Sequence, residues 1–167
     1  MNNELEYIML CGVCGAGKST LLNRITESTD KYTILSPDEK RKEHFGDYIF
    51  DQNETQIFKE LADLEKEAIK SGKSIIYDGM NISYKNRMNK LKLIRQYNPS
   101  VICKIIYLER DLKTLLAQNG SRSGNKRLED KVVIQNFKYI CPPTVQEKWD
   151  KIYYEYGDGI LHQYHQE

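Results

Sequence analysis

The chain lacks any long apolar run and any excess of one charge. No apolar stretch approaches the ~18 residues typical of a membrane-spanning helix, and the apolar stretch after Glu6 is interrupted by glycines rather than extended into a signal peptide. We therefore expect a soluble, cytoplasmic protein without a membrane partner. The net charge of the 167 residues is +1. This balance does not favour a nucleic-acid-binding surface over the whole chain, so any basic site must be local.

Cysteine is also scarce, with four residues: Cys11, Cys14, Cys103 and Cys141. A cytosolic chain would keep all four reduced. Cys11 and Cys14 form a Cys-x-x-Cys pair, but no second pair exists, which disfavours a zinc site. Packing of small residues explains the pair more simply than redox chemistry, although a redox role for Cys14 beside converging backbone amides stays open.

The most informative pattern present is a glycine-rich loop. Residues 12–19 match G-x-x-x-x-G-K-[ST] at every fixed position, between a predicted buried strand at residues 7–11 and a predicted helix at residues 19–28. In such a P-loop, glycines let successive N–H groups converge on phosphate oxygens. Lys18 would reach the β and γ phosphates, and Ser19 would give its hydroxyl to Mg²⁺. The predicted ATP-binding residues are Gly12, Val13, Cys14, Gly15, Ala16, Gly17, Lys18, Ser19 and Thr20.

Further apolar runs predict strands at residues 33–36, 73–77, 101–108 and 152–156, separated by segments with helical spacing. This alternation indicates right-handed βαβ units. We predict one α/β domain over residues 1–167, a three-layer P-loop NTPase with a mostly parallel sheet of four to five strands and helices on both faces. We also predict a loop over the site at residues 46–53, a helical lid at about 119–128, and a flexible tail at about 158–167.

Acidic residues follow two of the predicted strands. Ligands bind at the carboxyl ends of parallel strands, so Asp38 and Asp78 are expected beside the P-loop. Asp38 could accept a proton from a substrate hydroxyl, or only favour a helix N-terminus. Arg41, on the same helical face, could hold a substrate phosphate, or simply be solvated. Asp78 could hold Mg²⁺, or bond the backbone of its turn.

The basic lid segment offers two more candidates. Arg122 and Arg127 could close on the γ phosphate, although a basic loop without a catalytic part is the alternative. With Lys18 and Asp38, they complete the predicted catalytic set.

Several of these patterns together resemble one family. They are Gly12 to Thr20, Asp38-x-x-Arg41, Asp78-x-x-Asn81, Arg122 to Arg127, and Pro143-Thr144-x-x-Glu147-x-Trp149-Asp150. This set resembles the 5′-hydroxyl polynucleotide kinase domain of bacteriophage and bacterial end-healing enzymes, within the clan of small P-loop kinases. The resemblance runs from Leu5 to Tyr154. The chain departs from the family at Gln118 and Asn119, where an arginine is usual, and at Ser36-Pro37.

The resemblance implies a role for each matching residue. Asp38 would be the general base on the 5′-hydroxyl, and Arg41 would hold the phosphate next to the acceptor. Asp78 and Asn81 would also belong to the substrate-binding set, and the lid arginines would hold ATP phosphates. No Asp-x-Asp-Gly phosphatase motif is present, so we expect a stand-alone kinase.

The expected function is therefore ATP- and Mg²⁺-dependent transfer of the γ-phosphate to the 5′-hydroxyl of DNA or RNA. A kinase for a nucleotide, nucleoside, aminosugar or antibiotic is the first alternative. A nucleotide-gated binding ATPase is the second. A GTPase switch is disfavoured, because Asn89-Lys90 continues as Leu91-Lys92 instead of completing Asn-Lys-x-Asp.

Overall fold

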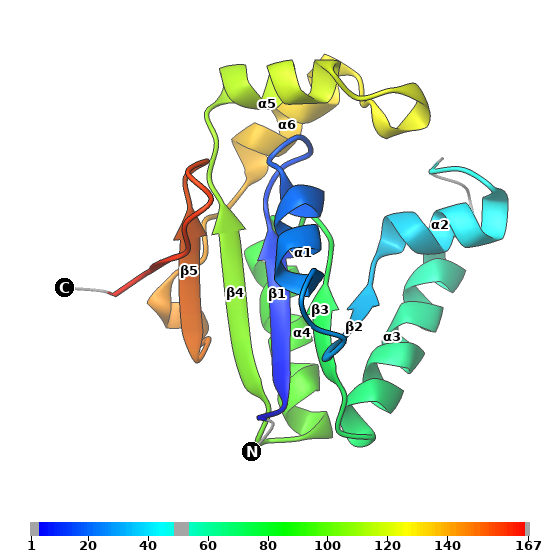
Figure 1. Cartoon of the computed structure of the whole chain (residues 1–167), viewed down its shortest axis with the longest axis vertical. Helices are drawn as coiled ribbons and strands as arrows, with labels where there is room; N and C mark the ends of the chain where they lie inside the picture. The colour runs from blue at the N-terminus through cyan, green and yellow to red at the C-terminus, as the bar shows by residue number, and fades with distance from the viewer. Residues whose placement is uncertain (1–3, 49–53, 166–167) are drawn as a thin grey trace.

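The computed structural model describes residues 4–48 and 54–165. The predicted loop at residues 46–53 is therefore described only as far as Tyr48, and residues 1–3 and 166–167 also lie outside the described parts. Within those parts, one sheet holds six strands in the order β2-β3-β1-β4-β5-β6 (Figure 1). The strands are β1 (Glu6–Cys11), β2 (Tyr32–Leu35), β3 (Ser74–Tyr77), β4 (Ile102–Leu108), β5 (Lys151–Glu155) and β6 (His162–Gln163).

Neighbouring strands from β2 to β5 run parallel, and β6 pairs antiparallel with β5. The parallel strands all end at the same edge of the sheet, the upper edge in Figure 1. The predicted mostly parallel α/β sheet is confirmed, with six strands in place of the four to five expected. β6 escaped prediction because two residues are too few for a periodic pattern.

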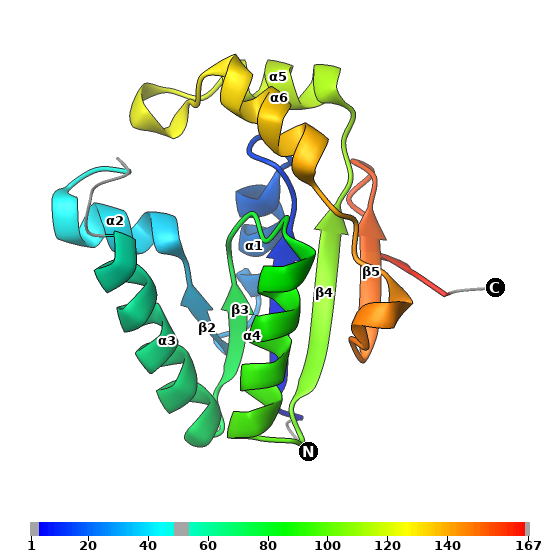
Figure 2. The ribbon, with the colours of Figure 1, turned by 180° about the vertical axis from the view of Figure 1, so that it is seen from behind.

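Helices cover both faces of the sheet. Helices α3 (Glu54–Lys70) and α4 (Tyr84–Tyr97) lie on the face seen in Figure 2, where Tyr7 and Met9 of β1 join their core. Helix α1 (Lys18–Thr26) lies on the opposite face, where Ile8 and Leu10 join a second core. Alternate residues of β1 thus point to opposite faces, as in any fully covered strand.

Three helices lie toward the carboxyl edge of the sheet: α2 (Pro37–Phe45), α5 (Leu112–Gly120) and α6 (Asp130–Tyr139). They bound the space above the strand ends (Figure 1). None of the helices in the described ranges is both long and apolar enough to cross a membrane.

The predicted lid begins inside α5 and contains a 3-10 turn, η1 (Gly124–Lys126). Asn119 is buried and ties the two ends of this segment together, since its Nδ2 donates to the carbonyl O of Leu128 at 2.8 Å and its Oδ1 accepts from the Leu128 N–H at 3.1 Å. The predicted flexible tail contains β6, and within it the ring of Tyr164 stacks on Tyr154 with centroids 5.1 Å apart. Its flexibility stays a prediction.

Glu6, at the start of β1, is expected to make the fold less stable as the pH becomes acidic. Burial raises the pKa of Glu6, but hydrogen bonds from Lys104, Lys31 and Tyr32 outweigh burial and bring the pKa down to about 2. An unfolded glutamate titrates near ~4.3, so the stabilisation is present above that pH and is lost as pH falls toward 2. We expect thermal melts to show a steeper loss of Tm over this interval in the wild type than in Glu6→Gln. Parallel curves would contradict this role of Glu6.

Candidate active site

The loop between β1 and α1 has the conformation that its glycines allow. Gly15 and Gly17 have φ of 88° and 96°, in the left-handed region that favours glycine. Gly17 caps α1, and the first turn of this helix carries neither a side-chain cap nor an acidic residue. Its first N–H groups and its positive end are therefore available to phosphate oxygens.

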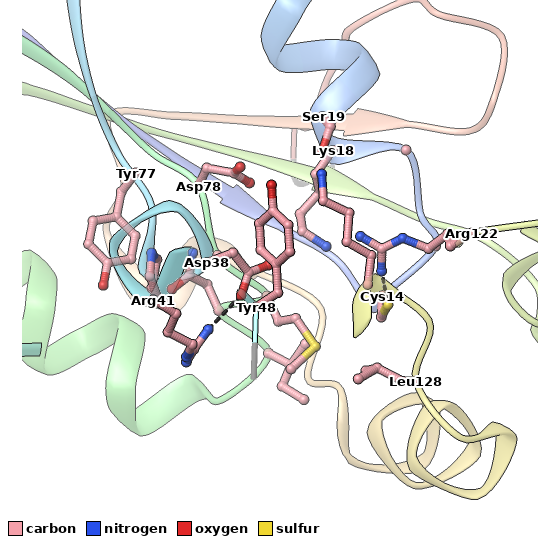
Figure 3. A pocket seen from close by; sticks show the side chains of 18 of the residues that line it. Cys14, Lys18, Ser19, Asp38, Arg41, Tyr48, Tyr77, Asp78, Arg122 and Leu128 are labelled. Atoms are coloured by element: carbon pink, nitrogen blue, oxygen red, sulfur yellow. Dashed lines mark hydrogen bonds and ion pairs between the residues drawn. The ribbon is translucent and has the colours of Figure 1, made fainter. Parts of the chain in front are cut away.

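A cleft of about 700 Å³ lies at the carboxyl edge of the sheet. It brings together most of the predicted site residues, shown in part in Figure 3: Cys14, Gly15, Gly17, Lys18, Ser19, Thr20, Asp38, Arg41, Asp78, Asn81 and Arg122. Four predicted residues do not line it. Gly12, Val13 and Ala16 are the buried residues of the P-loop itself, and Arg127 is exposed.

Lys18 and Asp78 carry opposite charges, and the charge of each affects the pKa of the other. Lys18 Nζ donates to the carbonyl O of Gly12 at 2.8 Å and of Val13 at 3.1 Å. Burial lowers the pKa of Lys18, and the charge of Asp78 acts against this. Burial likewise raises the pKa of Asp78, and the charge of Lys18 acts against it. A nucleotide phosphate would give the partly buried Lys18 a second anionic partner, which favours its charged form.

The donor set fits a Mg²⁺ ion bound together with a nucleotide. Ser19 offers a hydroxyl and Asp78 a carboxylate, and both residues line the cleft. Mg²⁺ commonly takes one or two protein oxygens and completes its octahedron with waters and phosphate oxygens. The described residues hold no group of three or more His, Cys, Asp or Glu side chains able to bind a metal ion.

The N-terminus of α2 directs Asp38 toward the cleft. The Ser36 hydroxyl caps the helix by accepting from the Glu39 N–H at 3.4 Å, and Pro37 takes the first helical position. Asp38 comes next, and its side chain is 60% exposed. The Ser36-Pro37 dipeptide, where the chain departs from the family, therefore builds a regular helix start and leaves the carboxylate in the cleft.

Arg41 is held between two carboxylates on the cleft wall. Its Nε and NH2 donate to the two carboxylate oxygens of Glu54 at 2.6 and 2.8 Å, and its NH1 donates to Asp38 Oδ1 at 2.5 Å (Figure 3). Burial lowers the pKa of Arg41, but the bonds to Glu54 and the charge of Asp38 outweigh burial and raise it. Glu54 thus fixes the guanidinium that orients Asp38. The predicted phosphate contact of Arg41 stays a prediction.

Asn81 lines the cleft, and its side chain also holds the loop after β3 in place. Its Nδ2 donates to the carbonyl O of Leu10 at 2.7 Å, and its backbone has a left-handed φ of 49°. This hydrogen bond fastens the segment after β3 to the carboxyl end of β1. A substrate contact by Asn81 stays a prediction. Such a contact would use the same side-chain amide that donates to the Leu10 carbonyl O.

The two lid arginines differ in position. The guanidinium of Arg122 donates to the thiol of Cys14 inside the cleft (Figure 3). Arg127 lies outside, and Lys126 lines the cleft in its place with Nζ 4.4 Å from the ring centroid of Tyr48. η1 ends at Lys126, and Arg127 follows it in extended backbone with φ of −80° and ψ of 120°, so Lys126 lines the cleft while Arg127 is exposed. The catalytic role of Arg127 stays a prediction.

Sequence reasoning missed Glu54, Tyr48 and Lys126. An acid at a helix start is already explained by the helix dipole, and Tyr48 and Lys126 stand in polar segments without periodicity. The assembled cleft can bind a polyphosphate at the P-loop and accept a proton at Asp38.

The chain is similar to known proteins in sequence and in fold. A family model described as an AAA domain matches residues 8–140. No curated protein matches the chain. Among solved structures, the chain is similar to one from the PezAT chromosomal toxin-antitoxin system of Streptococcus pneumoniae, with a TM-score of 0.69 and 16% identity over 96% of this chain and 71% of that chain.

Two further structures are similar. One is a chain of the Pnkp1/Rnl/Hen1 RNA repair complex, with a TM-score of 0.64 and 18% identity over 89% of this chain and 48% of that chain. The other is a gluconokinase from Sinorhizobium meliloti 1021, with a TM-score of 0.56 and 15% identity over 89% of this chain and 82% of that chain. The chain thus spans less than half of the matched chain in the RNA repair complex.

At these identities, the likeness to solved structures shows the fold, and the family match extends over the P-loop, Asp38, Asp78 and the lid. The chain belongs to the AAA domain family and has a P-loop kinase-like fold.

Proposed function

We propose that the chain is an ATP-dependent kinase that transfers the γ-phosphate to the 5′-hydroxyl of DNA or RNA. The observation that carries the proposal is that Asp38, Asp78 and the P-loop follow β2, β3 and β1, which are consecutive in the sheet, and line one cleft. Strands lie about 4.8 Å apart, so the ends of β1 and β2 are separated by about 10 Å. A substrate hydroxyl would approach the γ-phosphate through this part of the cleft, between Asp38 and the P-loop.

In this reaction, Asp38 accepts the proton of the acceptor hydroxyl as its oxygen attacks the γ-phosphorus. The bond to the β–γ bridging oxygen breaks, and ADP leaves. Lys18 and Arg122 neutralise charge on the phosphoryl oxygens, and Arg41 orients Asp38. Mg²⁺, when bound, supplies further charge neutralisation on the phosphates.

The side chains at the acceptor end of the cleft favour a nucleic-acid strand. Tyr48, Phe58 and Tyr77 line it, and Phe58 is 46% exposed. The ammonium groups of Lys126 and Lys42 lie 4.4 and 5.5 Å from the ring centroid of Tyr48. Tyr48 is partly buried and Tyr77 is buried, so Phe58 is the exposed ring of the three. Aromatic rings beside basic side chains suit single strands, whose bases stack while the backbone meets positive charge. Lys42 and Lys126 beside Tyr48 would form the local basic site that a nearly neutral chain requires.

Label transfer from γ-labelled ATP to a single-stranded 5′-hydroxyl oligonucleotide is the expected result, measured on a denaturing gel with Mg²⁺ present. The same strand bearing a 5′-phosphate is the matched control, because it lacks the attacking hydroxyl and should take up no label. Label on nucleosides or sugars but not on oligonucleotides would instead identify a small-molecule kinase. Phosphate release without any labelled acceptor would identify a nucleotide-gated ATPase.

A further inference from the structure

A buried ion pair links α4 to the part of the chain that follows the lid. The side chains of Arg87, in α4, and Glu147, in the 3-10 turn η2 (Val145–Glu147), are fully buried. Arg87 Nε and NH2 donate to the two carboxylate oxygens at 2.9 and 2.5 Å. The indole N–H of Trp149 donates to the same carboxylate at 2.9 Å. Apolar residues often replace such a pair without loss of stability, so stability alone does not account for these charges.

The remaining nitrogen of Arg87 reaches the active-site segment. NH1 donates to the carbonyl O of Asn81 at 3.0 Å. Asn81 in turn bonds the carbonyl O of Leu10 through its amide, and the Gly12 N–H donates to the carbonyl O of Met80 at 2.9 Å. The segment after β3 is therefore bonded to Arg87 on one side and to the start of the P-loop on the other.

Asp78 begins this same segment, three residues before Asn81. Its carboxylate faces the charge of Lys18, and it is one of the two side chains that fit Mg²⁺. The Asp78 N–H donates to the carbonyl O of Leu35 at 2.8 Å, so the segment is held at Asp78 by β2 and at Asn81 by Arg87. Loss of the hold at Asn81 would free the part of the segment that follows the Asp78 carboxylate.

We propose that Arg87 is a positioning residue for Mg²⁺-ATP, one that holds the Asn81 carbonyl so that Asp78 keeps its place against the P-loop. Glu147 and Trp149 keep Arg87 in position. The motif around Glu147 and Trp149 thereby supports the nucleotide site through Arg87. The consequence for phosphoryl transfer rests on the proposed kinase function, whereas the consequence for nucleotide binding does not.

Arg87→Lys tests this role. Lysine keeps the charge that Glu147 needs, but its single nitrogen lacks the planar fork that serves Glu147 and the Asn81 carbonyl together. We expect the ratio of ATP dissociation constants without and with Mg²⁺, measured by calorimetry, to fall about tenfold, since loss of an outer partner of a metal site commonly costs 10- to 100-fold in affinity. Amide exchange at residues 78–83 should rise. In the transfer assay, kcat should fall while KM for the oligonucleotide stays unchanged.

Arg95→Lys is the matched control on the same helix. Arg95 NH2 donates to the Lys148 carbonyl O at 2.7 Å and lies 3.4 Å from Asp150 Oδ2, so these contacts join α4 to the region after η2 and not to residues 78–83. This variant should bind ATP and exchange as the wild type does. An Arg87→Lys protein with a lower Tm but an unchanged Mg²⁺ dependence, or equal losses in both variants, would overturn the proposal.

Trp149→Phe is a second, milder test that can be used if Arg87→Lys does not fold. It removes one hydrogen bond to Glu147 and leaves both charges in place, so a smaller loss of Mg²⁺ dependence in the same direction is expected. An unchanged dependence would count against the proposal. A wild type that binds Mg²⁺-ATP but does not phosphorylate the oligonucleotide would refute the proposed function, while the binding comparison would still decide the part played by Arg87.

Discussion

Asp38→Asn is expected to lower turnover at least ~10²-fold with little effect on ATP binding. The amide oxygen of asparagine can still accept the hydrogen bond that Arg41 NH1 donates to Asp38, so the cleft keeps its shape. The variant loses the group that takes the proton from the acceptor hydroxyl. The measurements are kcat and KM for label transfer to a 5′-hydroxyl oligonucleotide, with ATP affinity determined separately by calorimetry.

Glu39→Gln is the matched control for charge. Glu39 is the next residue of α2, is exposed, and does not line the cleft. Its substitution removes one carboxylate charge from the same helical turn and should leave kcat close to the wild-type value. An equal fall in both variants would indicate a general electrostatic effect. Unchanged turnover in Asp38→Asn would rule out Asp38 as the base and leave nucleotide binding as the property that the site supports.

Local patterns in the sequence were sufficient to predict the P-loop and the strands around it. β1 ends at Cys11 and α1 begins at Lys18, in the order that the glycine pattern requires. The central strands are buried on both faces, so each appears as an apolar run whatever its neighbours are. The common position of Asp38 and Asp78 followed from one general rule, that parallel strands end at the same edge.

Contacts between distant segments could not be predicted in this way. Arg87 and Glu147 are 60 residues apart, and neither shows in a periodic pattern that its buried charge has a partner on another element. Gln118 and Asn119 were identified only as a departure from the polynucleotide kinase pattern that the chain resembles. The hydrogen bond from Asn119 to the Leu128 carbonyl O, which joins the two ends of the lid, could not be predicted from the sequence. The position of Lys126 in the cleft, and of Arg127 outside it, depends on where η1 ends, which no periodic pattern indicates.

Gly15→Ala is expected to reduce ATP affinity at least ~100-fold, because the P-loop is packed against α5 at this residue. An added Cβ would lie 2.8 Å from the carbonyl O of Leu115 and 3.2 Å from the N of Asn119, with φ at +88°. The left-handed backbone alone costs a non-glycine residue about 1–2 kcal/mol. The two neighbouring atoms belong to helix backbone, so they yield only if α5 moves. Calorimetry with ATP and thermal melting measure the two consequences.

Gly72→Ala is the control that introduces the left-handed backbone strain without a steric clash. Gly72 lies between α3 and β3 with φ at +74°, and an added Cβ would meet no atom within 4 Å. Its substitution should lower Tm by about 2–8 °C, the equivalent of the same 1–2 kcal/mol in a domain of this size, and leave ATP affinity unchanged. Equal ATP affinity in both variants would mean that the P-loop shifts without disturbing α5. Because Cys14 also contacts Asn119 and Arg122, a displaced α5 should disturb the lid as well as the phosphate site.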